Sequence, residues 1–157
     1  MTDMLVKLYN LAPLAPVRDR LSQEQITVRR AMAYERGIII QWVDRQFGAR
    51  WADECQLAFS RHPIGCQIAV SDSEICGFCC TDSAFRGFLG PIGMHDAFRG
   101  RGVGRLLLLT ALDAMRHQGY AYAVIGDVGE PDFFTRCAGA VTIEESTPGP
   151  YPARLKT

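Results

Sequence analysis

The chain has 157 residues and a mass of 17.4 kDa, a size that predicts one domain over residues 1–157. Its content of 48% hydrophobic and 22% charged residues is ordinary for a folded protein and argues against extensive disorder. The 17 basic side chains balance the 17 acidic ones, whereas a nucleic-acid-binding protein would carry a basic excess. The composition therefore predicts a folded protein that does not bind nucleic acid.

The N-terminal sequence and the length of the apolar runs bear on the cellular compartment. The chain does not open with a basic region followed by a long apolar run, so we expect no secretory signal. The longest apolar runs, at 37–40 and 106–109, are far too short to cross a bilayer. We therefore expect a cytoplasmic protein that does not associate with membranes.

The predicted elements mix strands and helices. The first 25 residues, which include Pro13 and Pro16, give no assignment, and the proline-rich tail at 147–157 is expected to be irregular. The order of the elements favours an α/β fold of three layers, in which helices flank a sheet of mixed direction. In chain order the pattern predicts a strand at 26–32, helices at 34–48 and 49–62, strands at 66–72, 74–82 and 84–95, a helix at 102–118, a strand at 120–127, a helix at 130–139 and a strand at 140–146.

Two of the six cysteines, Cys76 and Cys79, stand in the run CGFCC and raise the question of a metal or redox pair. The surrounding sequence predicts a strand, on which these two side chains point to opposite faces. Thiolates on opposite faces cannot share a metal, and no second pair with zinc spacing follows. We therefore expect no metal, and reduced cysteines that pack as small apolar residues.

The segment FRGRGVGR, residues 98–105, sets three glycines and three arginines at the start of the helix predicted at 102–118. A helix N-terminus exposes unpaired backbone N–H groups and the positive end of the helix dipole. Glycines let these amides approach an anion closely, and arginines offer forked donors that suit phosphate oxygens. The expected ligand of this loop is a pyrophosphate.

Three known phosphate loops compete for the segment. A Walker A loop needs a Lys-Ser/Thr pair where this chain has Arg105-Leu106, which also disfavours nucleotide hydrolysis. A dinucleotide-binding fingerprint has a different glycine spacing and would follow the first strand of a βαβ unit. The pattern Arg99-x-x-Gly102-x-Gly104 instead matches the R/Q-x-x-G-x-G/A pyrophosphate loop of the GCN5-related N-acetyltransferase (GNAT) family. Residues 92–140 as a whole resemble the acetyl-CoA-binding segment of that family.

This resemblance implies a mostly antiparallel sheet in a GNAT-like acyl-CoA N-acyltransferase fold. It implies direct transfer of an acetyl group from acetyl-CoA to a primary amine of a small molecule or a protein. The loop amides would hold the pyrophosphate, the opened strand would pair with the pantetheine arm, and two phenylalanines would lie beside the sulfur. The implied cofactor-binding residues are Ile92, Met94, Arg99, Gly100, Arg101, Gly102, Val103, Gly104, Arg105, Phe133 and Phe134.

The proton donor for the departing thiolate is open. Many GNAT enzymes use a tyrosine where this chain has Phe134, and a phenylalanine cannot donate a proton. Either solvent assists the thiolate, or another tyrosine, such as Tyr120, Tyr122 or Tyr151, reaches the sulfur. The missing hydroxyl also motivates the alternative that the chain is a CoA-binding sensor or interaction module without turnover.

The general base and the acceptor are equally open. Asp127 is the first candidate base and His95 the second, with Asp82 and Glu54 as weaker ones. Asp127 could equally cap the following helix. The resemblance places the acceptor pocket within residues 33–62 and the tail, and the tail either folds over the site or joins a contact in a homodimer.

Overall fold

A seven-stranded sheet in the order β2-β3-β4-β5-β6-β1-β7 forms the centre of the computed structural model, which describes residues 1–156. Of the described strand pairs, only β5 and β6 run parallel, which confirms the mixed, mostly antiparallel sheet. Thr157, the end of the predicted irregular tail, lies outside the described residues. The strands are β1 (Met4–Lys7), β2 (Ile26–Arg30), β3 (Cys66–Ser71), β4 (Glu74–Thr81), β5 (Phe88–Met94), β6 (Tyr122–Ile125) and β7 (Val141–Thr142).

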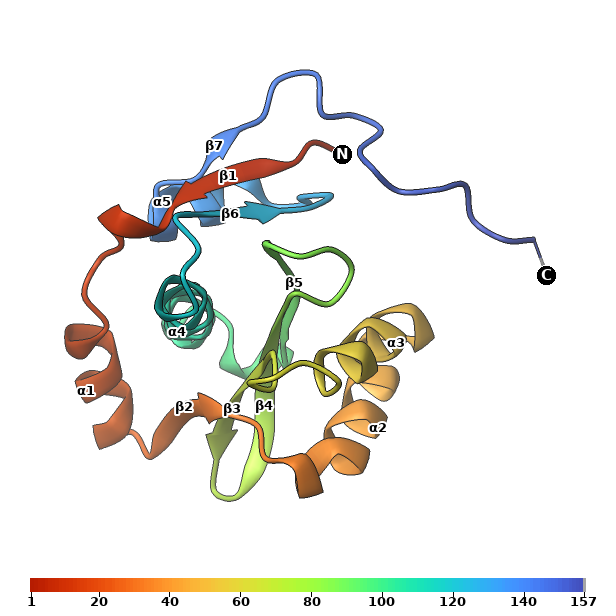
Figure 1. Cartoon of the computed structure of the whole chain (residues 1–157). Coiled ribbons are helices and arrows are strands. Elements are labelled where there is room, and N and C mark those ends of the chain that lie inside the picture. Colours follow the sequence, from red (N-terminus) through yellow and green to blue (C-terminus); the bar gives the residue numbers. More distant parts are fainter. Residues whose placement is uncertain (157) are drawn as a thin grey trace.

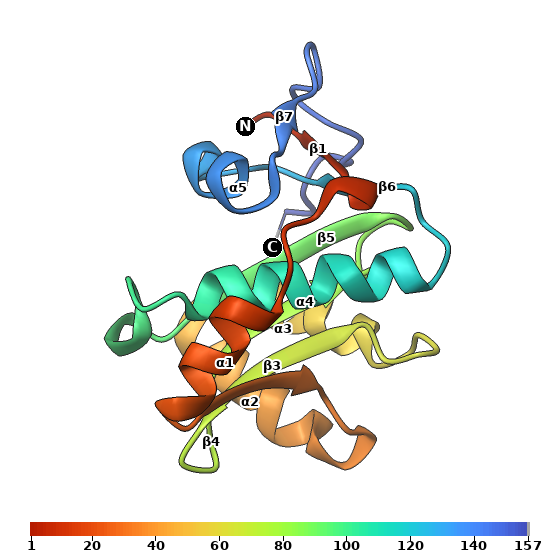
Figure 2. The same ribbon diagram turned by 90° about the vertical axis from the view of Figure 1, so that its left-hand side faces the viewer.

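Helices cover both faces of the sheet, as the three-layer prediction requires (Figures 1 and 2). Helices α1 (Ala15–Gln23) and α4 (Val103–His117) lie on one face, and α2 (Arg36–Phe47) and α3 (Ala49–Ala58) lie on the other. Helix α5 (Pro131–Ala138) shares its buried cluster with α4. Within residues 1–156, no helix combines the length and apolarity of a membrane span. The short 3₁₀ turns are η1 (Leu8–Asn10), η2 (Ala33–Glu35) and η3 (Asp96–Phe98).

Helix α4 is the centre of the larger core cluster. Its side chains at 106–109, four consecutive leucines, are all buried. A helix buried around most of its circumference needs apolar residues beyond one stripe, and α4 has neighbours on several sides, including the sheet, α1 and α5. The sheet's other face packs on α2 and α3 through a second cluster that includes Trp42 and Phe78. The two cores hold α4 and α3 on opposite sides of β4.

The N-terminal residues that gave no assignment contain a strand and a helix. Strand β1 lies between β6 and β7, so the first strand of the chain pairs with the last two (Figure 1). Helix α1 then crosses beside α4 (Figure 2). The C-terminal strand is shorter than the predicted 140–146, because only Val141 and Thr142 pair with β1.

The sheet opens between β5 and β6. These strands pair only at Phe88↔Val124 and Leu89↔Ile125. Gly90 follows with a φ of +135°, a conformation that glycine adopts far more readily than other residues. From Ile92 to Met94, β5 then continues along β4 alone. The edge of β5 that faces β6 is therefore left free beyond Leu89.

The prediction that Cys76 and Cys79 point to opposite faces of their strand is wrong. The β3–β4 register shifts between Ala69 and Val70, because Ala69 pairs with Gly77 while Val70 pairs with Ile75. This β-bulge adds one residue, Cys76, and breaks the alternation of side chains. Cys76 and Cys79 consequently both lie in the cluster around α4.

Candidate active site

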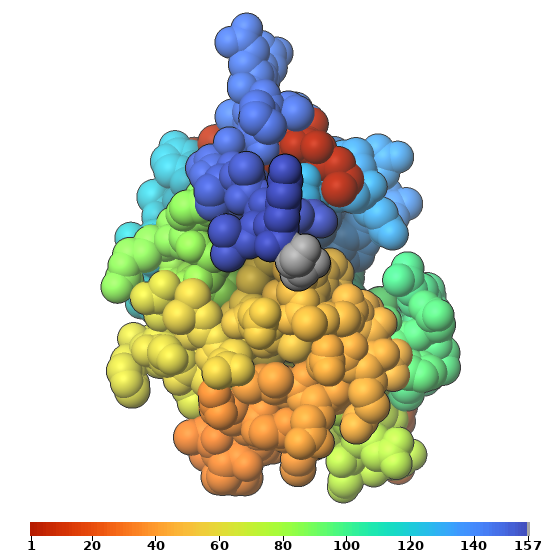
Figure 3. Space-filling view, turned by 90° about the vertical axis from the view of Figure 1, so that its right-hand side faces the viewer, coloured from red at the N-terminus to blue at the C-terminus, as the bar shows by residue number. Residues whose placement is uncertain are grey.

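A cleft of about 820 Å³ follows the opening between β5 and β6. Its walls come from these two strands, the loop before α4, the helix pair α2–α3, helix α5 and the C-terminal tail. Figure 3 shows the tail crossing this face of the molecule above α2 and α3. The cleft thus brings together the predicted loop, the opened strand and the predicted acceptor region.

The loop at the start of α4 exposes backbone amides to the cleft. Gly102 is the N-cap residue, has a φ of +88° and carries no side chain that could cap the helix. A Cβ atom there would collide with the guanidinium of Arg20. A Cβ atom on Gly104 would lie 3.1 Å from Cε of Met94, tighter than ordinary packing. The positive φ favours glycine at 102, and a side chain on Gly104 would require Met94 to shift.

The structure divides the predicted loop residues into two groups. Arg99, Gly100, Gly102, Gly104 and Arg105 line the cleft. The side chain of Val103 is buried in the core, so only its backbone can face a ligand. The Arg101 guanidinium turns to α1 instead.

Arg101 makes its contacts away from the cleft. Its Nη2 lies 3.8 Å from a Glu24 carboxylate oxygen, and its guanidinium carbon lies 5.2 Å from the centre of the Phe98 ring. Its carbonyl oxygen accepts a 2.9 Å hydrogen bond from Nη2 of Arg20. Arg20 was not among the residues that the sequence singled out. No local signal marks it, because the contact spans 81 positions of the chain.

The opened strand turns free amides toward the cleft. The N–H of His95 donates a 2.9 Å hydrogen bond to the carbonyl of Cys76 on β4. In an antiparallel ladder, alternate residues bond to the partner strand and the others point away from it. The N–H groups of Ile92 and Met94 therefore point away from β4, toward the cleft that both residues line. An extended ligand could pair with this edge as an added strand.

Two aromatic side chains of α5 complete this end of the cleft. Phe133 and Phe134 both line it, and their ring centroids lie 5.1 Å apart in an edge-to-face arrangement. Phe133 also reaches the start of α4, 3.5 Å from the position of a Cβ on Gly104. The phenylalanines give an apolar surface between the loop and the free edge of β5.

Two carboxylates line the other end of the cleft. Asp127 follows β6 with a φ of +51°, and its Oδ1 lies 3.5 Å from the amino nitrogen of Met1. Glu54 projects from α3, where burial raises its pKa and the nearby Arg50, 3.6 Å away, only partly opposes this. Phe47 and Trp51 form an aromatic wall beside them, with ring centroids 5.0 Å apart.

Two other predicted bases lie outside this set of lining residues. His95 is exposed, and its Nδ1 accepts a 3.1 Å hydrogen bond from the N–H of Ala97, which caps the 3₁₀ turn η3. Asp82 is buried, and its Oδ1 accepts hydrogen bonds from the N–H of Gly87 at 2.6 Å and the hydroxyl of Tyr120 at 2.9 Å. Both side chains hold turns of the backbone in place.

The three tyrosines named as alternative proton donors lie in different places in the structure. The hydroxyl of Tyr120 is bonded to Asp82, and that of Tyr122 lies 3.2 Å from the hydroxyl of Tyr9 on the surface. Tyr151, from the tail, lines the cleft. Burial, followed by the charges of nearby carboxylates, raises the pKa of Tyr151 to about 12. Only one of the three tyrosines therefore lies in the cleft.

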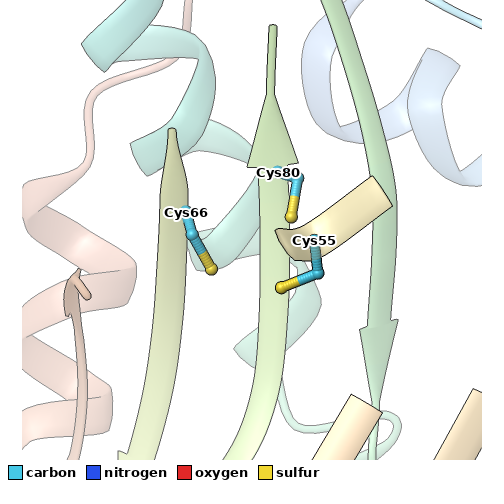
Figure 4. A group of neighbouring side chains, drawn as sticks. All are labelled: Cys55, Cys66 and Cys80. Carbon is cyan, nitrogen blue, oxygen red and sulfur yellow. The ribbon is translucent and has the colours of Figure 1, made fainter. Parts of the chain in front are cut away.

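Three other cysteines converge behind the cleft wall. The Sγ atoms of Cys55, Cys66 and Cys80 lie within 4.8 Å of one another, and Figure 4 shows them turned together from α3, β3 and β4. Thiol hydrogen bonds from the other two lower the pKa of Cys55, while burial raises that of Cys80. All three residues are fully buried in the apolar cluster beneath α2 and α3. As neutral thiols, the three side chains pack as small apolar groups in this layer.

The sequence of residues 36–137 matches the acetyltransferase (GNAT) family. This segment runs from α2 to α5 and contains the loop, the opened strand and both cleft phenylalanines. The chain belongs to the GNAT family. In this GNAT protein, β1, α1 and the tail lie outside the matched segment. A comparison with curated protein sequences returned no match.

Solved structures share the fold. One is a fungal multi-domain GH3 β-N-acetylglucosaminidase with a GCN5-related glucosamine N-acetyltransferase region, with a TM-score of 0.75 and 17% identity over 90% of this chain and 19% of that chain. A GCN5-related N-acetyltransferase from Sphaerobacter thermophilus has a TM-score of 0.71 and 20% identity, over 90% of this chain and 48% of that chain. A GNAT family acetyltransferase from Brucella melitensis in complex with acetyl-CoA has a TM-score of 0.51 and 19% identity, over 83% of this chain and 92% of that chain. This chain thus spans less than half of the first two chains, and the likeness shows the fold.

Proposed function

We propose that this GNAT protein transfers an acetyl group from acetyl-CoA to an amine. The observation that carries the proposal is the convergence of the glycine loop at α4 with the free edge of β5 in one cleft. The loop amides, with Arg99 and Arg105 beside them, suit the pyrophosphate of CoA. The edge of β5 suits the pantetheine arm, which carries amides of its own. The Brucella structure binds acetyl-CoA on the same fold.

The free amides of β5 suit the stabilisation of the negative charge that develops on the thioester oxygen. A neutral amine attacks the thioester carbonyl, and the carbonyl oxygen takes on negative charge in the tetrahedral intermediate. We assign the hydrogen bond to this oxygen to the N–H of Met94 or that of Ile92, because both point away from β4 along a strand that lines the cleft. The bond from carbon to sulfur then breaks, and the sulfur leaves with the electron pair. The nitrogen loses one proton and the sulfur gains one.

The two carboxylates of the cleft can bind a cationic acceptor only in place of their present partners. Glu54 pairs with Arg50 and Asp127 with the amino group of Met1, so we propose that an ammonium group replaces one of these cations while its carbon skeleton packs on Phe47 and Trp51. One carboxylate must also remove a proton from the ammonium group, because only the neutral amine is nucleophilic. Glu54 lines the cleft beside this aromatic wall and burial raises its pKa above the ordinary glutamate value, so we propose Glu54 as the base and keep Asp127 as the second candidate.

Amine-dependent release of CoA tests the proposed function. Wild-type protein is incubated with acetyl-CoA and, separately, with glucosamine, L-lysine, spermidine or buffer alone, and CoA and acetylated amine are separated by chromatography. We expect CoA and an acetylated amine to form in equal amounts with at least one probe. Binding of acetyl-CoA without release in any arm would favour the alternative, a CoA-binding module without turnover.

A further inference from the structure

The cleft needs a proton donor for the thiolate, and its phenylalanines cannot supply one. Phe133 and Phe134, which face the predicted position of the sulfur, carry no hydroxyl. Among the described residues that line the cleft, Tyr151 is the one with a hydroxyl group. It does not come from α5 or any other element of the matched segment, but from the tail after β7. The question is whether the structure holds it where an acid would be needed.

The hydroxyl of Tyr151 lies at the point where the sheet divides. A Cβ atom on Gly126, the residue after β6, would collide with this hydroxyl oxygen. Gly126 follows Ile125, the last residue of β6 that pairs with β5. The same Cβ position lies 3.2 Å from the ring of Phe88, which starts β5. Since a Cβ projects from the face of a sheet, the hydroxyl lies over Gly126 on the face that carries the Phe88 ring, next to the point where β5 and β6 separate.

The tail is anchored before Tyr151, at Ser146, and at the tyrosine ring itself. The hydroxyl of Ser146 accepts a 2.9 Å hydrogen bond from the N–H of Asp3 on one side and donates a 2.6 Å hydrogen bond to the carbonyl of Ile143. The ring of Tyr151 packs edge-on against Phe85, with centroids 5.7 Å apart. Side-chain contacts of this kind hold the phenol in one place rather than leaving it on a loose tail. In Figure 3 this tail segment lies against the face of the molecule that carries the cleft.

The surroundings keep the phenol protonated. Burial and the carboxylates of Asp3, Asp127 and Glu54 all disfavour a tyrosinate, so the pKa of Tyr151 lies at about 12. The nearby Arg50 acts in the opposite direction but with a smaller effect. At neutral pH the side chain therefore carries its proton, and because the raised pKa also makes it a weaker acid than an ordinary phenol, the transfer depends on the full negative charge that the leaving sulfur develops.

We propose that Tyr151 donates the proton that the CoA thiolate takes up as it leaves. This role rests on the proposed acetyl transfer. As the carbon–sulfur bond breaks, the sulfur receives the bonding electrons and the phenol proton, which forms free CoA. The tyrosinate recovers a proton from the newly acetylated nitrogen, by way of the base or water. The sum is thioester plus amine giving amide plus thiol, without any other reactant.

The variant Y151F tests the role because it keeps the ring and removes only the hydroxyl. The control Y122F removes a tyrosine hydroxyl on the surface, outside the cleft. Both variants and the wild type are compared for acetyl-CoA affinity by calorimetry and for CoA release with glucosamine, L-lysine and spermidine. We expect Y151F to bind acetyl-CoA within twofold of wild type but to lose about 100-fold in kcat. Y122F should match wild type in both.

Each other outcome overturns the role in a distinguishable way. If Y151F keeps kcat within threefold of wild type, the transfer proceeds without this phenol and the proposed function stands. If Y151F loses acetyl-CoA affinity as well, the hydroxyl shapes the cleft and is not an acid. If wild type binds acetyl-CoA but releases no CoA with any probe, the acetyl transfer itself is wrong and Tyr151 has no thiolate to protonate.

Discussion

The guanidinium of Arg20 donates a 2.9 Å hydrogen bond to the carbonyl oxygen of Arg101. The contact ties α1, which lies outside the segment that matches the GNAT family, to the loop that begins α4. The same guanidinium fills the space that a side chain on Gly102 would need. Helix α1 therefore acts as a brace behind the amides that we propose for the pyrophosphate.

Replacing Arg20 by alanine should weaken the binding of acetyl-CoA. The loop would lose one exposed hydrogen bond, for which we expect about 1 kcal/mol, or about fivefold in Kd. Arg18 offers a matched control, because it lies on the same helix and pairs with its neighbour Asp19. Calorimetry should show a raised Kd for R20A and an unchanged one for R18A. Equal values for both would mean that the loop keeps its shape without the brace.

A side chain at Gly104 should obstruct the same site from the other side. Its Cβ would lie 3.1 Å from Met94 and 3.5 Å from Phe133, so valine must displace side chains that line the cleft. Overpacking of this kind costs about 1–3 kcal/mol, and we expect the Kd for acetyl-CoA to rise at least about tenfold. The control is Gly37→Ala on α2, where a Cβ meets nothing within 4 Å. Unaltered affinity in a folded G104V protein would place the ligand elsewhere.

The rate of transfer should depend on the ionisation of Glu54. Burial raises its pKa above the ordinary glutamate value of about 4.3, and only its carboxylate form can accept a proton. The rate should therefore be low at acidic pH, where the carboxyl is protonated, and rise as pH increases through this raised pKa. E54Q should lose about 100-fold in kcat near neutral pH and lose this pH dependence.

Asp53, the exposed neighbour of Glu54 on α3, is the control for this experiment. D53N should retain both the rate and the pH profile of wild type. A wild-type profile in E54Q would exclude Glu54 as the base, and the variant D127N would then test the other carboxylate of the cleft.

Glu35 should make the stability of the protein sensitive to acid. It accepts two hydrogen bonds from Arg29, at 2.6 and 2.9 Å, and one from the N–H of Met32 at 2.8 Å. Led by the Arg29 hydrogen bonds, these interactions lower its pKa to about 2. A lowered pKa stabilises the folded state above the unfolded value of about 4.3, and the contribution is lost as pH falls toward 2.

The variant E35Q measures this contribution. The pair is partly exposed, so we expect its free energy of unfolding at pH 7 to fall by about 0.5 kcal/mol. In urea titrations the difference from wild type should shrink as pH is lowered from 5 to 2.5. The exposed Glu74 provides the control, since E74Q should track wild type at each pH. A difference that stays constant with pH would assign the effect to shape rather than charge.

The sequence predicted best those parts of the fold that local pattern determines. The helix expected at 102–118 is observed at Val103–His117, because four leucines and the glycines at its ends leave little choice. The hairpin at 66–82 is nearly as close. Strand β1 was missed, because its four residues are defined by partners at least 115 positions away.

The candidate site shows the same division. The loop glycines follow from the chemistry of a helix N-terminus and could be named from the sequence. The position of Tyr151 could not, because it depends on how an irregular tail crosses the surface (Figure 3). The β-bulge at Cys76 was also invisible, since strands are expected to alternate and nothing in CGFCC marks the extra residue. Tertiary contacts, rather than local propensity, decide these features.

A calorimetric comparison of acetyl-CoA with S-acetylpantetheine, which lacks the pyrophosphate together with the adenosine 3′-phosphate beyond it, tests the central claim most directly. If the amides before α4 hold the pyrophosphate, wild-type protein should bind one acetyl-CoA per chain. It should bind S-acetylpantetheine at least about 100-fold more weakly, since several charge-assisted hydrogen bonds are lost. Equal affinity for the two, or no heat with acetyl-CoA from folded protein, would contradict the assignment of this loop.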